Sequence, residues 1–556
     1  MSAFKRELAR CNPDPSGRRW LFVPYDQLSD RIGPLSREDP CNLGIVLVEN
    51  VWKASRRPYH KQKLALILAN MRHFALEQAQ RGVAVRHVVS LGPYRNALEP
   101  LFEELGPMMV MEPSERELRK DLEPLFDSRQ LEVIPHEGRL TKHEQFDAIK
   151  KDGPQWRMDA FYRRVRRDTG VLMEKNRPMG GKFSFDTSNR KPWRGKPPAP
   201  LPPTFPSNSI KEEIGTLIRE SFSHHPGHLD LGMLPSTAED AHKLWNWAMD
   251  ACLDSFGPYE DAMSLRSTGI FHTRISSVMN IHRLLPRQVL SDVLEMDLPL
   301  ESKEGFVRQV IGWREFVRHV HAATDGFRRG IESIPPVDEH SGDGGYSRWA
   351  GERWAARRTG EDPDGGAAPC SLGGETPLPP AYWGNRSGFN CLDHVVDSVW
   401  TEGYSHHITR LMILANLATL LDVSPRELTD WFWIAYTDAY DWVVEPNVLG
   451  MGTYALGNLM TTKPYVAGAS YINRMSDFCP DCGFDPKKSC LITNLYWAFL
   501  ARNEDKLKSN PRIAMIINGL AKRGSDLRSR DRKIFELVRD RLVQGERVSV
   551  RDIRKI

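Results

Sequence analysis

The sequence predicts a molecule in two parts, an N-terminal α/β domain with a parallel, Rossmann-like sheet and a C-terminal all-α domain. Over residues 18–135, short apolar runs with strand character alternate with helical stretches, a pattern typical of a parallel sheet covered by helices. From about residue 212 onward, almost every periodic stretch is helical. Residues 178–206 separate the two patterns, and their richness in Pro, Gly and Lys indicates a linker.

The strands of the predicted sheet are short apolar runs. They occupy residues 20–23, 44–48, 83–89, 108–111 and 131–134. A helix is predicted over 61–81, because Leu64, Met71 and Phe74 fall on one face. Parallel sheets bind ligands at the carboxyl ends of their strands, which makes that edge a candidate binding site. No GxGxxG motif follows the first strand, so a conventional NAD-binding fold has no support.

These patterns divide the chain into segments. We expect an irregular N-terminal extension over 1–17, the α/β domain over 18–135, a linker with a helix over 136–215 and the helical domain over 216–556. Helices are predicted over 155–175, 238–253, 286–296, 302–323, 392–421, 425–439 and 491–502. Residues 325–380 are dense in Gly, Pro and Ser, which indicates a long surface loop inserted into the helical domain.

Composition argues against a membrane protein. The chain has 40% hydrophobic and 27% charged residues, as soluble globular proteins do. Its longest apolar stretch, 411–421, is shorter than the roughly 20 residues that span a bilayer. The charged N-terminus lacks the apolar segment of a signal peptide. We therefore expect a cytoplasmic protein with no membrane association, present as a monomer.

Basic residues gather in two places. Residues 521–556 carry 12 Lys/Arg against 6 Asp/Glu, and the run over 163–167 contains four arginines beside Tyr162. Basic residues next to an aromatic ring suit the phosphate backbone of a nucleic acid. A solvated helix face is the alternative interpretation of either run.

Cysteines form the most specific motif. Cys479 and Cys482 make a CxxC pair, Cys490 follows, and Cys391 lies 88 residues before Cys479. A chain without secretion signals is not expected to hold structural disulfides, which leaves a metal site, a redox dithiol or a chance arrangement. Thiolates are soft ligands that suit zinc or an iron–sulfur cluster. Cys370, within the predicted loop, is expected to be a lone thiol.

Several segments together resemble the photolyase/cryptochrome flavoproteins, and among them the iron–sulfur bacterial branch, the prokaryotic (6-4) photolyases. The resemblance covers roughly residues 18–520. It rests on FGPYEDAM (256–263), FHTRISSVMN (271–280), GFVRQVIGWREFVR (305–318), GFNC (388–391), GYSHHITRLM (403–412), DAYDWVVEPN (438–447), TKPYVAGASYINRMSDFCPDC (462–482) and NLYWAFLARN (494–503). It implies an α/β antenna domain and a helical FAD-binding domain with an iron–sulfur cluster.

The resemblance assigns the cysteines to a metal cluster. Cys391, Cys479, Cys482 and Cys490 would be the four thiolate ligands of a [4Fe–4S] cluster, while Cys11, Cys41, Cys252 and Cys370 would not bind it. Only seven residues separate Cys482 from Cys490, a short spacing for this branch. Zinc remains the alternative metal.

The resemblance also implies an FAD site. Thr273 and Ser276 would bind the pyrophosphate at a helix N-terminus. The other residues that it places around the flavin are Gln309, Trp313, Glu315, Asp438 and Asn447. The family has an acid near flavin N5 two residues before a proline, whereas here Glu445 stands one residue before Pro446.

Catalysis and electron supply have candidates of their own. The resemblance makes His407 the acid of the site and His406 its neighbour, and imidazole suits proton transfer near neutral pH. Trp431, Trp383 and Tyr471 match aromatic positions that relay electrons to the excited flavin. Phe432 stands where a tyrosine is common, so one branch of the relay is expected to be missing. The alternative for the histidine pair is a core or surface role.

A second chromophore is expected at the carboxyl edge of the sheet. Asp26, Gln27 and Glu49 match polar positions around a 6,7-dimethyl-8-ribityllumazine antenna. Tyr25 replaces the glycine of the family's Gly-Asp-Gln-Leu motif, next to where the ring should lie. We expect lumazine to bind if Tyr25 points outward, and no second chromophore if it points inward.

Together these features predict a (6-4) DNA photolyase, a lyase that uses light to repair (6-4) pyrimidine–pyrimidone photoproducts in UV-damaged DNA. Photoexcited reduced FAD would donate one electron to the flipped lesion, and His407 would supply a proton. Mg²⁺ is a further candidate cofactor. One alternative is a cryptochrome-like blue-light photoreceptor with the same cofactors and no repair activity. Another is a zinc-stabilised DNA-binding protein without flavin.

Overall fold

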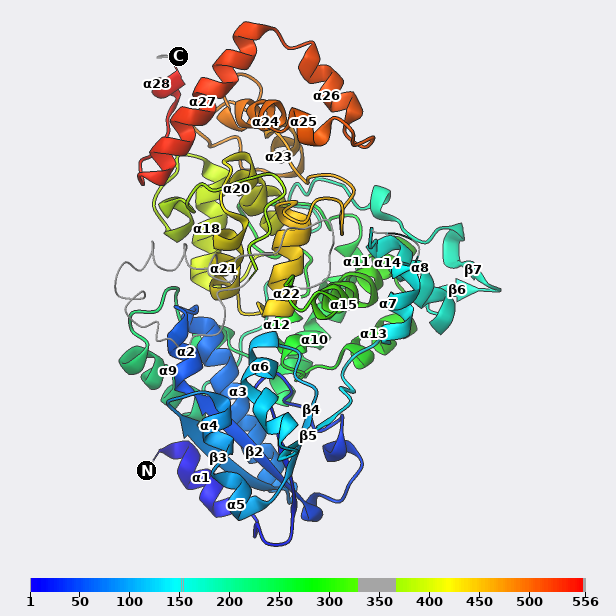
Figure 1. The fold of residues 1–556 in the computed structure, drawn as a ribbon, viewed down its shortest axis with the longest axis vertical. Helices are drawn as coiled ribbons and strands as arrows, with labels where there is room; N and C mark the ends of the chain where they lie inside the picture. The colour runs from blue at the N-terminus through cyan, green and yellow to red at the C-terminus, as the bar shows by residue number, and fades with distance from the viewer. Residues whose placement is uncertain (1, 152, 154, 329–366, 554–556) are drawn as a thin grey trace.

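The structure is a computed structural model that describes residues 2–151, 153, 155–328 and 367–553 (Figure 1). Its N-terminal part is a five-stranded parallel sheet in the order β3-β2-β1-β4-β5. The strands are β1 (Arg19–Phe22), β2 (Leu43–Asn50), β3 (Ala84–Ser90), β4 (Met108–Met111) and β5 (Leu131–Ile134). The predicted α/β domain is confirmed, and every predicted strand lies within two residues of an observed one.

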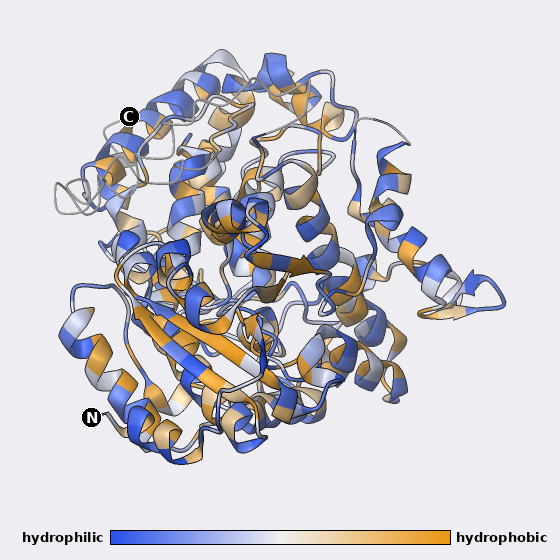
Figure 2. Ribbon diagram, turned by 60° about the horizontal axis from the view of Figure 1, so that its bottom comes forward, coloured by the Kyte–Doolittle hydropathy of each residue, from blue (hydrophilic) through white to orange (hydrophobic). Residues whose placement is uncertain are grey.

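Helices cover the sheet, and their apolar faces close its core. They are α2 (Val51–Arg56), α3 (Lys61–Gln80), α4 (Tyr94–Leu98), α5 (Leu101–Leu105) and α6 (Arg116–Asp127). Figure 2 shows the strands mainly in hydrophobic colours, with hydrophilic residues on the outer sides of the covering helices. Val46 and Leu47 at the centre of β2 are fully buried, as expected for a strand covered on both faces.

The N-terminal extension is not irregular. It forms α1 (Ala3–Cys11), which Ser2 caps by accepting a hydrogen bond from the Lys5 amide. Phe4 and Leu8 on this helix are buried against the N-terminal core. The extension is therefore an integral part of the α/β domain.

The linker carries more structure than its composition indicates. It contains α7 (His143–Lys150), α8 (Met158–Thr169), the hairpin β6 (Met173–Glu174) and β7 (Arg177–Pro178), and α9 (Ser209–Ser221). The hairpin projects at the right of Figure 1. Helix α9 packs against α3 and α1, so the chain returns to the α/β domain before it enters the helical domain.

The helical domain follows. Its helices before the gap in the described residues are α10 (Ala238–Ala251), α11 (Leu253–Phe256), α12 (Ser276–Asn280), α13 (Pro286–Glu295), α14 (Leu300–Val307), η6 (Arg308–Arg314) and α15 (Glu315–Ala323). After the gap come η8 (Pro380–Trp383), α18 (Asn390–Glu402), α19 (His407–Thr409), η9 (Arg410–Ala415), α20 (Asn416–Leu420), α21 (Pro425–Ala435), α22 (Asp441–Glu445), η10 (Pro446–Gly452), α23 (Ala469–Met475), α24 (Leu491–Arg502), α25 (Glu504–Leu507), α26 (Ala514–Ala521), α27 (Ser525–Val543) and α28 (Val550–Ile553).

The predicted helix over 392–421 is broken in two. Gly403 adopts a left-handed conformation with φ 63° and ends α18, a role that glycine fills without the strain other residues incur. The next helix begins only at His407, which leaves His406 as its N-cap residue. Most of the predicted loop 325–380 lies outside the described residues. No helix in the described ranges is long and apolar enough to cross a membrane.

Candidate functional site

Three histidines from two distant segments meet in the helical domain. The ring nitrogens of His272, His406 and His407 lie within 4.8 Å of one another. The rings of His272 and His406 stack at a centroid distance of 4.3 Å, and that of His407 lies 5.2 Å from His272. The break at Gly403 makes this arrangement possible, because it turns the chain so that two adjacent histidines face the same partner.

The three histidines differ in their access to solvent. His272 and His406 are buried, and burial lowers the pKa of both, that of His272 to about 3. Their Nε2 and Nδ1 atoms respectively have no hydrogen-bond partner among the described residues. The His407 side chain is 41% exposed, and its Nε2 lies 3.8 Å from an Asp261 carboxylate oxygen. His407 is thus the member of this histidine cluster that can exchange a proton with solvent.

One helical turn beyond His406, a buried ion pair continues the site. Both Arg410 guanidinium nitrogens bind the Asp438 carboxylate at 3.0 Å, and the Ser276 hydroxyl donates to the same carboxylate at 2.7 Å. Burial opposes ionisation of Asp438, but Arg410 and Ser276 more than offset that effect and lower its pKa. Arg410 also lies 3.9 Å above the Tyr436 ring. Asp438 is therefore held as an oriented carboxylate.

The segments 272–276 and 406–410 frame the site. His272 and His406, at the start of these segments, stack on each other, and Ser276 and Arg410, four residues later, both bind Asp438. Thr273 is buried next to His272. η6 and η10, which carry predicted site residues, and η9, which begins at Arg410, have π-helical hydrogen bonding. Such hydrogen bonding is rare overall but frequent at functional sites.

Gln309 and Trp313 on η6 contact Glu260 and Phe316 respectively, a set of contacts separate from that around Asp438. The Gln309 amide donates to the Glu260 carboxylate at 2.5 Å, and Glu260 also accepts from Arg308 at 3.2 Å. Trp313 contacts Phe316 edge to face at 6.2 Å. Glu260 belongs to the FGPYEDAM motif, as does Asp261, so this motif supplies carboxylates to both sets of contacts.

Glu315 is bound on another side. It accepts hydrogen bonds from the Leu140 and Thr141 amides and the Thr141 hydroxyl, and forms ion pairs with Arg314 and Arg318. Its pKa falls to about 2, because these partners outweigh the effect of burial. Glu315 therefore ties α15 to the linker, through contacts that do not involve Asp438.

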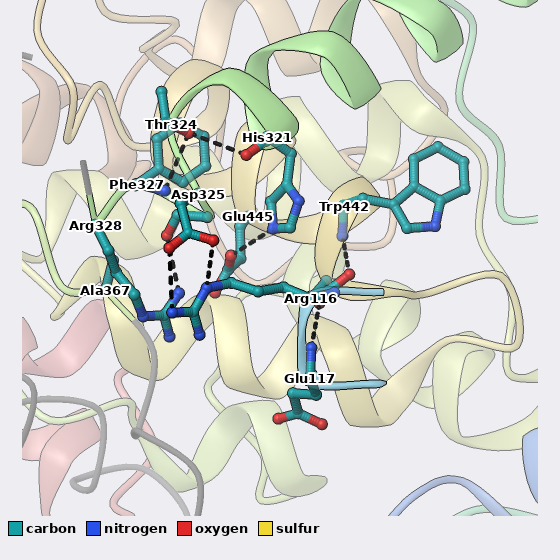
Figure 3. Close-up of polar contacts among 12 residues, drawn as sticks. Arg116, Glu117, His321, Thr324, Asp325, Phe327, Arg328, Ala367, Trp442 and Glu445 are labelled. Atoms are coloured by element: carbon teal, nitrogen blue, oxygen red, sulfur yellow. Dashed lines mark hydrogen bonds and ion pairs between the residues drawn. The ribbon is translucent and has the colours of Figure 1, made fainter. Parts of the chain in front are cut away.

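Glu445 is likewise part of a buried network (Figure 3). Its carboxylate contacts His321 Nε2 at 2.9 Å and Arg426 at 2.8 Å. Arg426 also donates to the Ala367 carbonyl at 3.2 Å. Asn447, two residues later, donates to the Val443 carbonyl. The shift of the acid by one position thus accompanies a structural role for Glu445.

Four cysteines converge at the other end of the helical domain. Cys391 begins the buried face of α18, Cys479 and Cys482 share a tight turn closed by a 3.1 Å amide hydrogen bond, and Cys490 precedes α24. All four pack against the same hydrophobic core. Burial raises the pKa of the Cys391 thiol, and electrostatic interaction with the other three cysteines raises it further.

This sulfur set fits a soft metal centre. Burial also raises the pKa of Cys479 to about 11 and that of Cys490 to about 12. Thiols in such an apolar site ionise only against a bound cation, and four soft donors suit iron–sulfur or zinc. The remaining cysteines lie apart from this cysteine cluster. Cys11 is on α1 and Cys41 is near β2. The Cys252 thiol contacts the His272 carbonyl, and the Cys370 sulfur accepts a hydrogen bond from the Gly374 amide.

Only some of the aromatic residues predicted to transfer electrons are linked by ring contacts. Trp431 is buried and Trp383 is partly buried, and each contacts Trp400. Tyr471 lies on α23, with Arg474 5.7 Å from its ring. Phe432 packs between Trp431 and Tyr436 at 5.3 Å from each.

Tyr25 points inward at the carboxyl edge of the sheet. It is 5% exposed, its hydroxyl donates to the Glu115 carboxylate, and its ring lies parallel to those of Tyr94 and Tyr440 at 6.3 Å. The three tyrosines line one hollow together with Lys53. The bulk of Tyr25 therefore fills space where the family's glycine would leave room.

The predicted antenna residues do not share contacts. Burial raises the pKa of Asp26 to about 7, and Gln27 donates to the Met111 carbonyl. Glu49 instead binds Arg72 through both oxygens at 2.6 and 2.9 Å, which lowers its pKa to about 2. Glu49 thus serves the contact between β2 and α3.

The arginines of the basic run on α8 have partners within the protein. Arg163 and Arg164 pair with Asp159 and Asp168, each four residues away. Arg166 is buried and donates to backbone carbonyls, including that of Leu172. These arginines are already neutralised or buried, which favours the alternative interpretation.

Two residues of the site, His272 and Arg410, were not predicted. His272 and Arg410 both lie in quoted motifs, but neither is adjacent in sequence to the residues it contacts. A signal was present, because each stands four residues from a predicted site residue, His272 from Ser276 and Arg410 from His406.

A parallel α/β domain joined to a helical domain with a buried histidine and carboxylate site defines a class of two-domain proteins, and comparison identifies the family. A family model described as deoxyribodipyrimidine photo-lyase-related protein matches residues 21–232. A (6-4) photolyase of Agrobacterium fabrum is 32% identical over 527 residues, covering 91% of this chain and 96% of the relative. The chain belongs to the photolyase family.

Other similarities are shorter or more distant. An uncharacterized protein of Acanthamoeba polyphaga mimivirus is 34% identical over 102 residues, 18% of this chain and 80% of that protein. A bacterial class III photolyase from Agrobacterium tumefaciens has 13% identity and a TM-score of 0.48, with 97% of this chain and 98% of that chain covered. An archaeal photolyase from Sulfolobus tokodaii with two FAD molecules has 13% identity and a TM-score of 0.49, with 97% and 99% covered.

Proposed function

We propose that this protein is a (6-4) photolyase that binds FAD and a [4Fe–4S] cluster and repairs (6-4) photoproducts in DNA. The observation that carries the proposal is the stacked, buried histidine cluster one helical turn from the Arg410–Asp438 pair. The kinship with a (6-4) photolyase supports the same activity.

The residues around Asp438 suit a flavin. Unpartnered ring nitrogens on His272 and His406 are buried, and a bound polar ring system would satisfy them. Asp438, fixed by Arg410 and Ser276, would orient such a ring as a hydrogen-bond acceptor. FAD, when bound, supplies the light-driven one-electron chemistry.

We assign proton transfer to His407. It is the solvent-accessible member of the histidine cluster, and Asp261 lies at 3.8 Å to hold the protonated ring. His406, buried with a lowered pKa, stays neutral at physiological pH and positions the site through its stack with His272. The proton leaves a His407 ring nitrogen for the lesion and returns when repair is complete.

The cysteine cluster would hold iron and sulfide as a structural centre. Cys391 comes from α18, and the other three come from the segment that leads into α24, so one metal centre would join two parts of the helical domain. Metal binding at such a site contributes directly to folding. Zinc in place of iron is the outcome that would correct this assignment.

The two remaining cofactor expectations have less support. Inward Tyr25 and the Glu49–Arg72 pair favour a sheet edge without lumazine. Within the described residues, the ligand atoms of His272, His406 and His407 lie within 4.8 Å of one another, but imidazole nitrogens do not suit Mg²⁺.

DNA would bind with the damaged bases flipped into the histidine site. The weak stacking of a (6-4) lesion lowers the cost of flipping, and phosphate contacts make binding depend on salt. The test uses reduced protein, blue light and two oligonucleotides, one with a (6-4) photoproduct and one with a cyclobutane dimer. We expect repair of the first only. Flavin photochemistry without repair of either would favour the photoreceptor alternative, and repair of the dimer alone would correct the substrate.

A further inference from the structure

Trp400 lies between the two tryptophans assigned to electron supply. Its ring is parallel to that of Trp383, with a centroid distance of 5.4 Å and an interplanar angle of 19°. On the other side it meets Trp431 edge to face at 5.8 Å. Each contact is within the usual range for packed aromatic rings. The three indoles therefore form one continuous row from a partly buried ring to a fully buried one.

One carbonyl holds the inner two indoles in register. The Nε1–H groups of Trp400 and Trp431 both donate to the Tyr382 carbonyl oxygen at 2.9 Å. A carbonyl dipole directed at both N–H groups favours positive charge on either ring, because its negative end faces them. The carbonyl is also a very weak base, so an oxidised indole here keeps its proton.

The neighbouring branch cannot carry charge outward. Phe432 contacts Trp431 but has no heteroatom that makes the ring oxidisable. Tyr436, next in line, has its hydroxyl bonded to the Ser405 hydroxyl at 2.8 Å, and burial raises its pKa. Tyrosine must release its proton when oxidised, and a serine hydroxyl does not accept it. The row through Trp400 is the remaining route among these rings.

The surroundings of Trp400 tolerate positive charge. His60 lies parallel to it at 5.9 Å, and burial lowers the pKa of this imidazole to about 4, so the ring is neutral at physiological pH. Asp397 lines the same surface hollow as Trp383 and Trp400, and Arg386 pairs with its carboxylate at 2.6 Å. No unpaired cation among these described neighbours therefore opposes a positive charge on Trp400.

We propose that Trp400 is the central electron carrier of this protein, and that it replaces the route closed by Phe432. The inference rests on the proposed flavin binding. Trp431 loses one electron to the photoexcited oxidised flavin, Trp400 gives one electron to the Trp431 radical cation, and Trp383 gives one to Trp400. A thiol in solution then reduces the Trp383 radical cation by one electron and loses its own proton. The net result is one electron moved from the thiol to the flavin.

The test compares wild type, Trp400→Phe, Trp383→Phe and Trp247→Phe, a control from α10, under blue light with dithiothreitol. We expect Trp400→Phe to slow photoreduction about tenfold or more, a barrier higher by about 1.4 kcal/mol, while Trp247→Phe has no effect. A second measurement traps radicals with a nitroso spin trap and locates the adduct by peptide mass spectrometry. Wild type should carry it on Trp383, Trp400→Phe should not, and Trp383→Phe should show slow photoreduction with the adduct on Trp400.

Flavin content and chemical reduction should be unchanged in all variants, which separates relay effects from misfolding. If Trp400→Phe photoreduces at the wild-type rate and still forms the Trp383 adduct, the inference is wrong although the proposed function stands. If the wild type binds no flavin, both are overturned. If Trp400→Phe does not fold, the position of the spin-trap adduct in the wild type decides. A wild type with no adduct on Trp383 or Trp400 would overturn the inference. A wild-type adduct on Trp383 that disappears in Trp383→Phe would sustain it.

Discussion

Replacing Arg410 by methionine should strongly lower the free energy of unfolding. It should also reverse the contribution of Asp438 to the pH dependence of that free energy. The change leaves Asp438 buried, with Ser276 as its remaining side-chain donor. Breaking a buried ion pair by removing one partner costs about 3–5 kcal/mol, because the other charge is left uncompensated. The exposed pair Arg386–Asp397 offers a control, since removing Arg386 should cost about 0–1 kcal/mol.

The Asp438 carboxyl group also determines in which direction stability changes with pH. In the wild type, the lowered pKa of Asp438 stabilises the fold above the unfolded value, and that stability is lost as pH falls through the folded value. In Arg410→Met, burial without a cation raises the carboxyl pKa, so the loss should shrink as pH falls. Urea unfolding from about pH 2 to pH 8 covers both effects, because the wild-type loss begins near the unfolded carboxyl pKa of about 3.9. The double variant Arg410→Met/Asp438→Asn should recover most of the stability. Equal losses in Arg410→Met and Arg386→Met would refute this reasoning.

Three further predictions follow from other residues. Cys391→Ser should lose iron, sulfide and much of the soluble yield, whereas exposed Cys41→Ser should lose none of them; iron and acid-labile sulfide analysis checks this, and equal metal content in both would contradict it. Tyr25→Gly should open the hollow at the sheet edge, so that mass spectrometry of heat-released molecules finds a second chromophore only in the variant; one in the wild type would show that Tyr25 does not close the site. Glu445→Gln should remove up to about 3 kcal/mol at pH 7 and flatten the loss of stability between about pH 5 and pH 2, because a pKa of about 2 makes this carboxylate stabilising above its unfolded value; an unchanged acid limb in urea unfolding would contradict it.

The sheet was predictable because each strand is a short apolar run between polar turns, a local property of the sequence. Helix α1 was missed, since its alternation of charged residues hides the two apolar side chains, Phe4 and Leu8, that dock it. The break at Gly403 was missed for the opposite reason: the apolar period continues through it, and one left-handed glycine overrides that pattern.

The site was predictable in its residues more than in its partners. Family motifs located Ser276, Asp438 and the histidine pair, which do meet. They also located Glu315 and Glu49, whose partners Thr141 and Arg72 lie outside any quoted motif. Contacts between residues far apart in the sequence depend on how their segments pack, and one sequence does not contain that information.

Repair of a defined (6-4) oligonucleotide by chemically reduced protein, with His407→Ala beside the wild type, tests the assignment of function and mechanism together. The wild type should restore the two pyrimidines under blue light and not in the dark. His407→Ala should keep its flavin and its photoreduction but lose repair by about 10²–10⁴-fold, the usual contribution of general acid catalysis. No repair by the wild type, or repair by His407→Ala at the wild-type rate, would contradict the role we give to the histidine cluster.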